Sequence, residues 1–396
     1  MQIHIREKNE SLKDIARRYT VSEESIRRIN SLGDLSPAEG EELLILTPTR
    51  TYTVQYGDTV ERIALRFGVS PANIVALNPW ICDRELKQGE EVALKYDGRA
   101  YGMAAANGYF YKGCGDEEMS RALPYLTYVT FASAAADRKG VKKTFDDEAF
   151  VKKASERSKI PLVRVFDRYP ERYCHAEGLE EYARWLIDLA LSGGYKGVVL
   201  DTCALSEQKK IFAEFLIKLR KMMIGNDLIL ITEIDEKSPT EYSEYADASV
   251  LYYPKYAMEN PPSFDEGEKK VLSDFACNAE SARTFVDLPS LVKSTQGYTC
   301  IEDGLMTARR LGCKIKRNEN TLLSHFRDKK QGEYCYSSLK SVEELFKLIN
   351  DYDYMGVCFD IMRTPLSHIM MYNSLFKTSY YTNVRSAEGC SRAGAG

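Results

Sequence analysis

An internal repeat in the first 95 residues constrains the fold more than any other feature of the sequence. Residues of the first copy recur 48 positions later in the second, so that Ser11 returns as Thr59 and Asn30 returns as Asn78. Each copy reads as strand, helix, helix, strand, with apolar residues at helical spacing inside it and a glycine turn before its last strand. The repeat therefore predicts two small βααβ domains in tandem.

The rest of the chain alternates short apolar runs with amphipathic stretches. Eight such runs are typical of a (β/α)8 barrel with parallel strands, and an open doubly wound sheet is the competing architecture. The runs cover residues 103–111, 126–136, 162–166, 198–200, 228–232, 248–253, 284–288 and 356–361. We thus expect an α/β, TIM-like barrel at 100–375, preceded by the repeat domains at 1–47 and 51–95 and followed by a tail at 376–396.

Composition excludes several classes of partner and cofactor. With 54 basic and 58 acidic residues, the chain gives no reason to expect nucleic acid or an anionic membrane surface as a partner. No apolar run approaches the roughly 18 residues of a membrane span, and the first residues lack the features of a signal peptide, so we expect a protein kept inside a cell. Four scattered histidines and ten cysteines without a CxxC pair predict reduced thiols, no metal site and no cofactor.

The second repeat copy resembles the LysM domain in the segments YGDTVERIA, FGVSPANIVALNP and LKQGEEV. LysM domains bind chitin or peptidoglycan through the loop before the first helix and the loop after the second. The resemblance implies glycan contacts by Gly57, Asp58, Thr59, Val60, Asn78, Pro79, Trp80 and Ile81. The same residues could instead cap helices and fill a small core, and Trp80 could cover the neighbouring domain. The first copy departs from the pattern, because Asn9, Glu10 and Ser11 replace Gly-Asp-Thr.

Polar residues follow most of the expected barrel strands. Side chains at the C-terminal ends of such strands form the functional site of this architecture. A ring of carboxylates there suits sugar hydroxyls or an acid–base pair, although polar residues at strand ends also simply meet solvent. The residues at these ends are Asp167, Asp201, Cys203, Glu233, Asp235, Tyr253, Asp287 and Asp360.

The order of segments after the repeats resembles glycoside hydrolase family 18, and among its members the LysM-bearing spore-cortex and spore-germination glycosidases. The segments are LPYLTYVTFAS, GGYKGVVLD, FAEFLIKLRKMM, YADASVLYY and YSSLKSVEELFKLINDYDYMGVCFD. That family cleaves β-1,4 bonds next to an N-acetylglucosamine, using the sugar's own acetamide as nucleophile. A glutamate at the end of the fourth strand protonates the leaving oxygen, and an aspartate two residues earlier orients the acetamide.

The family's catalytic motif, D-x-x-D-x-D-x-E, is degenerate in this chain. Its four acidic positions fall on Lys196, Val199, Asp201 and Cys203, so that Asp201 alone is kept and Cys203 stands at the proton donor. A cysteine side chain is shorter than glutamate and has an ordinary pKa of about 8.5, so it would replace a carboxylic acid poorly. The sequence therefore predicts that this barrel has lost the general acid of the family.

Two further strand ends depart from the family. Asp360 stands where the family has the tryptophan under the sugar, and Pro254 replaces the aspartate after Tyr253. Together, the departures predict a spore- or cell-wall-associated protein that binds peptidoglycan or a chitin-like glycan and carries an inactive barrel. Two alternatives stay open. One is an active N-acetylglucosaminidase of the spore cortex that uses Glu207 or Glu233 as its acid, and the other is a structural coat protein cross-linked through its cysteines and 26 tyrosines.

Overall fold

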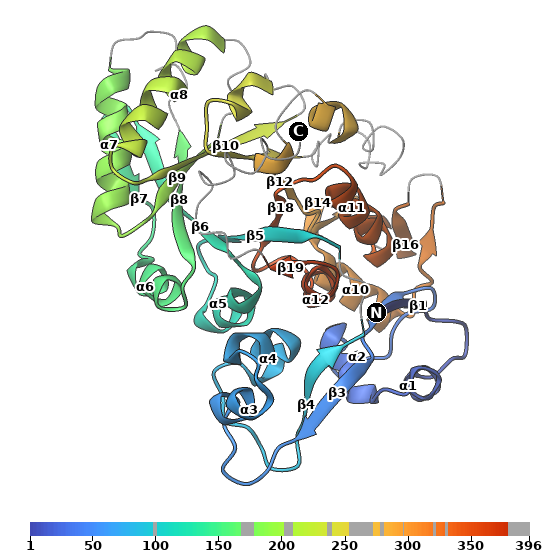
Figure 1. The fold of residues 1–396 in the computed structure, drawn as a ribbon. Coiled ribbons are helices and arrows are strands. Elements are labelled where there is room, and N and C mark those ends of the chain that lie inside the picture. Colours follow the sequence, from blue (N-terminus) through green and yellow to red (C-terminus); the bar gives the residue numbers. More distant parts are fainter. Residues whose placement is uncertain are drawn as a thin grey trace, which may run out of the picture.

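The chain folds into two small N-terminal domains, a parallel barrel and an antiparallel sheet inserted into the barrel (Figure 1). The structure is a computed structural model that describes most of the chain. The described residues are 1–97, 101–167, 178–201, 209–235, 240–252, 272–277, 281–295, 297–319, 322–328 and 332–378. Cys203, Glu207 and Tyr253 lie outside them.

The repeat forms two βααβ domains, as the sequence predicts. The first repeat domain consists of β1 (Gln2–Ile5), α1 (Leu12–Tyr19), α2 (Glu23–Ile29) and β2 (Glu42–Ile45). The second repeat domain consists of β3 (Pro48–Thr53), α3 (Val60–Phe67), α4 (Pro71–Leu77) and β4 (Glu91–Tyr96). In each domain the first and last strands pair in antiparallel fashion and the two helices cover them.

The residues that recur between the copies hold these two domains together. Ser11 and Thr59 are the N-caps of α1 and α3, and each hydroxyl accepts a hydrogen bond from the backbone N–H three residues later. Asn30 ties the end of α2 to β2, because its amide donates to the carbonyls of Ile26 and Leu44. Asn78 makes the corresponding bonds in the second copy, from α4 to β4. The recurring residues are therefore those that cap the helices and join helix to strand in each βααβ domain.

Eight parallel strands close into a barrel, which confirms the expected fold and excludes the open sheet. The ladder runs β5-β6-β8-β9-β10-β11-β12-β18 and returns from β18 to β5. The strands are β5 (Met103–Phe110), β6 (Tyr128–Asp137), β8 (Ile160–Asp167), β9 (Gly197–Asp201), β10 (Ile229–Asp235), β11 (Ala248–Tyr252), β12 (Thr284–Asp287) and β18 (Gly356–Asp360). Each of the eight apolar runs contains or overlaps one of them.

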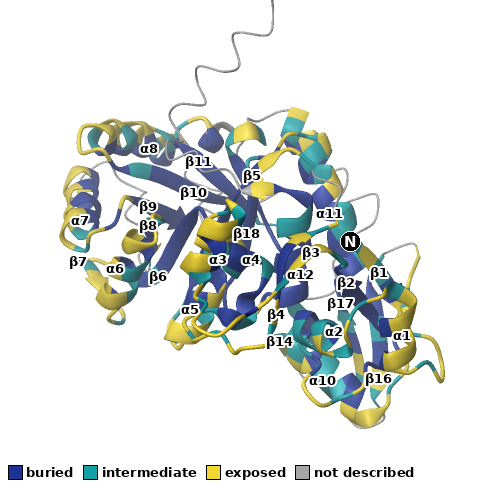
Figure 2. Cartoon of the chain, turned by 60° about the horizontal axis from the view of Figure 1, so that its bottom comes forward, coloured by how far each residue is buried: buried dark blue, intermediate teal, exposed yellow. Residues whose placement is uncertain are grey.

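Helices surround the barrel and leave its strands buried (Figure 2). They are α5 (Asp116–Ala122), α6 (Glu148–Glu156), α7 (Leu179–Ser192), α8 (Lys209–Ile224), α11 (Leu339–Asp351) and α12 (Leu366–Leu375), with the 3-10 turn η2 (Leu123–Tyr125) after α5. Short strands β7 (Gly140–Lys143) and β19 (Lys377–Thr378) extend β6 and β5 at the margins. Inside the barrel, alternate strand residues pack against one another, including the buried rings of Tyr128 and Phe285.

An antiparallel sheet of five strands, which the sequence analysis does not predict, lies between β12 and α11. Its order is β14-β13-β17-β16-β15, and α10 packs on it. The elements are β13 (Leu291–Ser294), β14 (Gly297–Cys300), α10 (Ile301–Leu311), β15 (Lys316–Arg317), β16 (Ser324–Asp328) and β17 (Gly332–Tyr336). These strands are short and half-polar, so they lack the continuous apolar runs that reveal the barrel strands.

The inserted sheet holds the first repeat domain through a buried ion pair. The Nη2 atom of Arg309, in α10, lies 2.6 Å from Oε1 of Glu41, and both side chains are only 2% exposed. The same guanidinium donates to the backbone carbonyls of Asn30 and Ser31, in the loop after α2. The charge of Arg309 is therefore compensated entirely by the first repeat domain.

Backbone contacts beside this ion pair also join the first repeat domain to the insertion. The N–H of Ile315 donates to the carbonyl of Glu39 at 2.8 Å, and Ala38 belongs to the apolar core of the insertion. Gly40 has a φ of +81°, and a Cβ atom there would lie 2.0 Å from the carbonyl oxygen of Ile315. The first repeat domain is consequently an integral part of the large domain.

Replacing Arg309 with methionine should destabilise the chain strongly, because Glu41 would keep a buried charge without its partner. The expected loss is about 3–5 kcal/mol in the free energy of unfolding, measured by chemical denaturation. The matched control is Lys314→Met, which removes the exposed ion pair with Glu39 in the same interface and should cost less than about 1 kcal/mol. Similar losses in the two variants would contradict the role assigned to Arg309.

Candidate functional site

Arg164 joins two carboxylates at the C-terminal ends of neighbouring barrel strands. Its Nε lies 2.7 and 2.9 Å from the two carboxylate oxygens of Glu233, and its Nη2 lies 2.7 Å from Glu233 Oε2. The same Nη2 lies 3.0 Å from Asp201 Oδ2. Since β8, β9 and β10 are adjacent, the three residues stand side by side across the mouth of the barrel. We call Arg164, Asp201 and Glu233 the mouth cluster.

Two tyrosines also contact Glu233, whose side chain is fully buried. The hydroxyl of Tyr109 donates to Glu233 Oε1 at 2.8 Å, and the hydroxyl of Tyr252 donates to the same oxygen at 3.1 Å. Burial, together with the nearby charge of Glu233, raises the pKa of both phenols well above the usual value. Arg164 and both tyrosines act as donors to the carboxyl group of Glu233.

The outer edge of the mouth cluster is accessible. Asp201 and Arg164 have side chains that are 24% and 19% exposed, whereas Glu233 lies beneath them. A sugar hydroxyl or acetamide could reach the exposed edges of Asp201 and Arg164. Proton donation by Glu233 would first require separating it from a bidentate guanidinium, which is unfavourable in a buried site.

The other expected strand-end residues have local surroundings of their own. Asp360 ends β18, and its carboxylate accepts hydrogen bonds from the N–H groups of Met362 and Arg363, which closes the following turn. Asp287 ends β12 and is buried, while Asp167 ends β8 and is partly exposed. Of the expected set, Asp201 and Glu233 are brought together through Arg164. Asp235 ends β10, and its side chain lies outside the described part.

Sequence reasoning missed three members of this site, namely Tyr109, Arg164 and Tyr252. Strand alternation was the available signal, because side chains two residues apart point to the same face. Leu162 and Val250 point into the barrel, so Arg164 and Tyr252 must do so too. The same alternation indicates that Tyr252 is an inward residue of β11.

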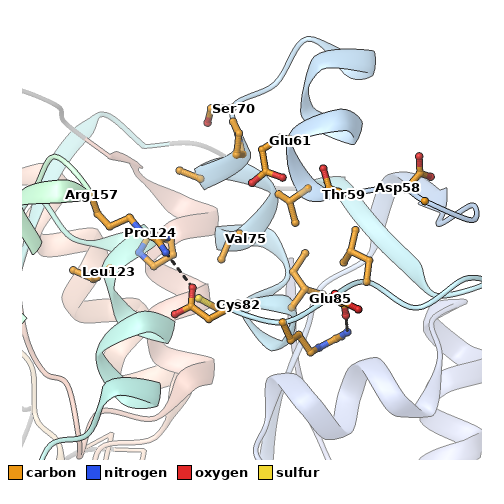
Figure 3. A pocket seen from close by; sticks show the side chains of 18 of the residues that line it. Asp58, Thr59, Glu61, Ser70, Val75, Cys82, Glu85, Leu123, Pro124 and Arg157 are labelled. Atoms are coloured by element: carbon orange, nitrogen blue, oxygen red, sulfur yellow. Dashed lines mark hydrogen bonds and ion pairs between the residues drawn. The ribbon is translucent and has the colours of Figure 1, made fainter. Parts of the chain in front are cut away.

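A groove of about 980 Å³ lies between the second repeat domain and the barrel (Figure 3). We call it the domain groove. Five of the eight expected glycan-contact residues line it, namely Gly57, Asp58, Thr59, Val60 and Ile81. Asn78 is fully buried and makes the internal bonds described above, and Pro79 is buried as well. Neither of these two side chains faces the groove.

Trp80 covers a domain boundary. The guanidinium of Arg28, from the first repeat domain, lies over its ring at 5.4 Å from the centroid, within the range of a cation–π contact. Trp80 also packs against the large apolar core that includes the barrel helices. Trp80 thus makes a contact with neighbouring domains, and its glycan contact stays a prediction.

Polar residues of the loop before α3 line the wall of the domain groove. Asp58 accepts hydrogen bonds from the Tyr52 hydroxyl at 2.7 Å and from the Gln55 N–H at 2.8 Å, and these bonds hold its pKa below the usual value. Thr59 caps α3. Beside them, Tyr56 is 90% exposed and lines the same groove. Sequence reasoning missed Tyr56, although an aromatic residue directly before the Gly57 turn was visible.

The domain groove and the mouth cluster lie at opposite ends of the barrel. On the barrel side, the groove is lined by residues of η2 and of the loop between α6 and β8. Loops that lead from a helix into a barrel strand lie at the N-terminal ends of the strands, whereas Asp201 and Glu233 lie toward the C-terminal ends. A ligand in the domain groove would therefore be remote from Arg164.

The described residues offer no arrangement for a metal ion, since no three His, Cys, Asp or Glu side chains gather among them. No helix in the described part of the chain is long and apolar enough to cross a membrane.

The family model of the LysM domain matches residues 7–45 and 52–94, and the two repeat domains are LysM domains. With the closed barrel, the chain therefore combines a tandem LysM unit with a TIM-like barrel.

Particular relatives share this combination or parts of it. The spore cortex-lytic enzyme SleL of Bacillus megaterium superposes with a TM-score of 0.73 at 16% identity, covering 96% of this chain and 99% of that one. A chitinase of Chromobacterium violaceum matches 68% of this chain and 98% of its own, with a TM-score of 0.58 at 14% identity. At such identities these likenesses show the fold alone.

A relative by sequence is the Bacillus subtilis protein YdhD, which carries the name of a sporulation-specific glycosylase. It is 26% identical over 254 residues, which is 60% of this chain. The match spans 59% of the length of YdhD, so this chain corresponds to about three fifths of that relative.

Replacing Arg164 with methionine should destabilise the barrel by about 3–5 kcal/mol in chemical denaturation, because Glu233 would be left buried without a counter-charge. The double variant Arg164→Met/Glu233→Met should recover much of that loss, since it removes both charges. Arg184→Met is the control, as it breaks an exposed pair with Glu180 and should cost less than about 1 kcal/mol. A double variant less stable than Arg164→Met would contradict the assigned pairing.

Proposed function

We propose that this protein binds a peptidoglycan-like N-acetylated glycan through its second LysM domain and that its barrel does not hydrolyse the glycan. Glycan binding is supported by the domain groove. Residues 57–60, from the loop before α3 and the start of that helix, line this groove next to the almost fully exposed ring of Tyr56. An exposed aromatic ring beside hydrogen-bonding loops is the combination expected of a site for amphipathic sugar rings.

The first repeat domain has a different role in this proposal. Its loop after α2 is bound by Arg309, which donates hydrogen bonds to the carbonyls of Asn30 and Ser31. Ser31 also donates a hydrogen bond to Glu302 of α10, so this loop faces the insertion. In the second repeat domain, residues 81–86 of the loop after α4 line the open groove. We therefore assign docking to the first domain and glycan binding to the second.

The mouth cluster supports the non-hydrolytic half of the proposal. Glu233, one of the two acids considered as a substitute proton donor, accepts hydrogen bonds from Arg164 and both tyrosines and is fully buried. General acid catalysis requires a proton that the group can give up at the reacting oxygen. With Cys203 at the donor position of the family motif, we infer that the barrel has become a scaffold that positions the LysM domains.

The names of the relatives indicate where such a glycan is met. SleL is a spore cortex-lytic enzyme, and YdhD is named for sporulation. We propose that the glycan of this protein is peptidoglycan of the spore or the cell wall.

Tyr56→Ala should weaken binding of the full chain to purified peptidoglycan without loss of stability, because the ring is exposed and its removal leaves the core intact. Loss of one aromatic contact corresponds to roughly three- to ten-fold in affinity, measured by a sedimentation binding assay. The matched control is Lys8→Ala, at the equivalent position of the first repeat domain, which should leave affinity unchanged. If Lys8→Ala weakened binding more than Tyr56→Ala, the glycan would bind to the first repeat domain, and the proposed site would be wrong.

A further inference from the structure

The barrel supplies one wall of the domain groove. Its contribution consists of Leu123 and Pro124 from η2 and of Arg157 and Lys159 from the loop between α6 and β8. Figure 3 shows Arg157, Pro124 and Leu123 facing the second repeat domain across the groove, with Asp58 at the far end. A glycan strand held by the LysM loops would therefore meet a surface that a separate LysM domain does not have.

Direct bonds fix this wall in place. The hydroxyl of Tyr125 donates to the carbonyl of Ala76 at the end of α4, at 2.7 Å. On the other side of the contact, Asp83 of the second repeat domain pairs with Lys153 at 3.2 Å and with Arg157 at 3.0 Å. The wall and the LysM loops thus keep a fixed separation, as a preorganised binding site requires.

The barrel wall is apolar and cationic, and carboxylates do not occur among its lining residues. Arg157 is half exposed and uses one nitrogen for Asp83. Lys159 donates to the carbonyl of Leu126 at 2.8 Å and has no carboxylate partner among the described residues. The remaining charged residues that line the groove belong to the second repeat domain and are Asp58, Glu61, Asp83, Arg84 and Glu85.

We propose that the domain groove selects glycans that carry carboxylates, with Arg157 and Lys159 of the barrel pairing with the carboxylate while the LysM loops hold the sugar rings. This inference rests on the proposed function, because it requires that the second LysM domain binds a glycan at all. Every second sugar of peptidoglycan carries a lactyl group, whose carboxylate is free where no stem peptide is attached, whereas chitin has the same β-1,4-linked N-acetylated backbone without any carboxylate. The barrel wall would therefore distinguish peptide-free muramic glycans from chitin.

The protonation of Lys159 adds a pH dependence to this selection. Burial, assisted by the neighbouring charge of Arg157, lowers its pKa to about 8. Below that pH the ammonium group is charged and attracts the glycan carboxylate, and above it the attraction from Lys159 is lost while Arg157 keeps its charge. Binding of a carboxylate-bearing glycan should therefore weaken as the pH rises through about 8, whereas binding of a neutral glycan should not.

The experiment compares two tetrasaccharides by calorimetric titration of the full chain, one of alternating N-acetylglucosamine and N-acetylmuramic acid and one of N-acetylglucosamine alone. Lys159→Gln should lower affinity for the muramic ligand about ten-fold, since a charge-assisted hydrogen bond is lost, and leave the neutral ligand unchanged within two-fold. Lys159→Arg should keep tight binding of the muramic ligand and remove the weakening near pH 8. The matched control for lost charge is Lys142→Gln, an exposed cation on β7 outside the groove, which should change neither affinity.

The outcomes separate this inference from the proposed function. If the wild-type chain binds both ligands equally, or if Lys159→Gln weakens both to the same extent, selection by the barrel wall is wrong while glycan binding stands. If the wild-type chain binds neither ligand, both the inference and the proposed function are overturned. Within the described part of the chain Lys159 makes no ion pair across the domain contact, so its variants test the charge without detaching Asp83 from Arg157.

Discussion

The barrel of this protein depends on the guanidinium of Arg164. Glu233 lies at full burial inside a closed ladder of strands, where an uncompensated carboxylate would be strongly destabilising. Arg164 compensates it with bidentate bonds and also reaches Asp201, so one cation occupies the space between two strand ends. The proposal that the barrel does not hydrolyse glycans rests in part on this arrangement, because Glu233 and Asp201 are both engaged by the same guanidinium.

Two copies of one small domain have acquired different surroundings. Asn30 and Asn78 make the same bonds in each copy, which shows that the fold is repeated faithfully. The difference lies outside the repeat, where the insertion presents Arg309 to the first domain and the barrel presents η2 and the α6–β8 loop to the second. The first contact covers the loop after α2, and the second leaves a groove. Domain packing, more than the repeat itself, therefore decides which copy is open to a ligand.

The sequence predicts the architecture well where burial imposes a simple pattern. Parallel barrel strands are covered on both faces and so appear as continuous apolar runs, and the helical spacing of the repeats is equally direct. The inserted sheet escapes prediction because a strand such as β16 (Ser324–Asp328) contains a single apolar residue, Phe326, and so shows neither an apolar run nor an alternating pattern. Tyr252 could be predicted from strand alternation, but only once the inward register of β11 is known. Arg157 and Lys159 could not be assigned to the domain groove, because their place depends on how two domains pack.

Our proposal for the mouth cluster is that it does not hydrolyse glycans. It is tested most directly by incubating the purified full chain with spore-cortex peptidoglycan and measuring the release of new reducing ends, beside the variant Asp201→Asn. We expect release at the level of the buffer control for both proteins, because Asp201 and Glu233 are both held by hydrogen bonds from Arg164. Release above the control that falls in Asp201→Asn would contradict the account and show that the barrel is a working glycosidase.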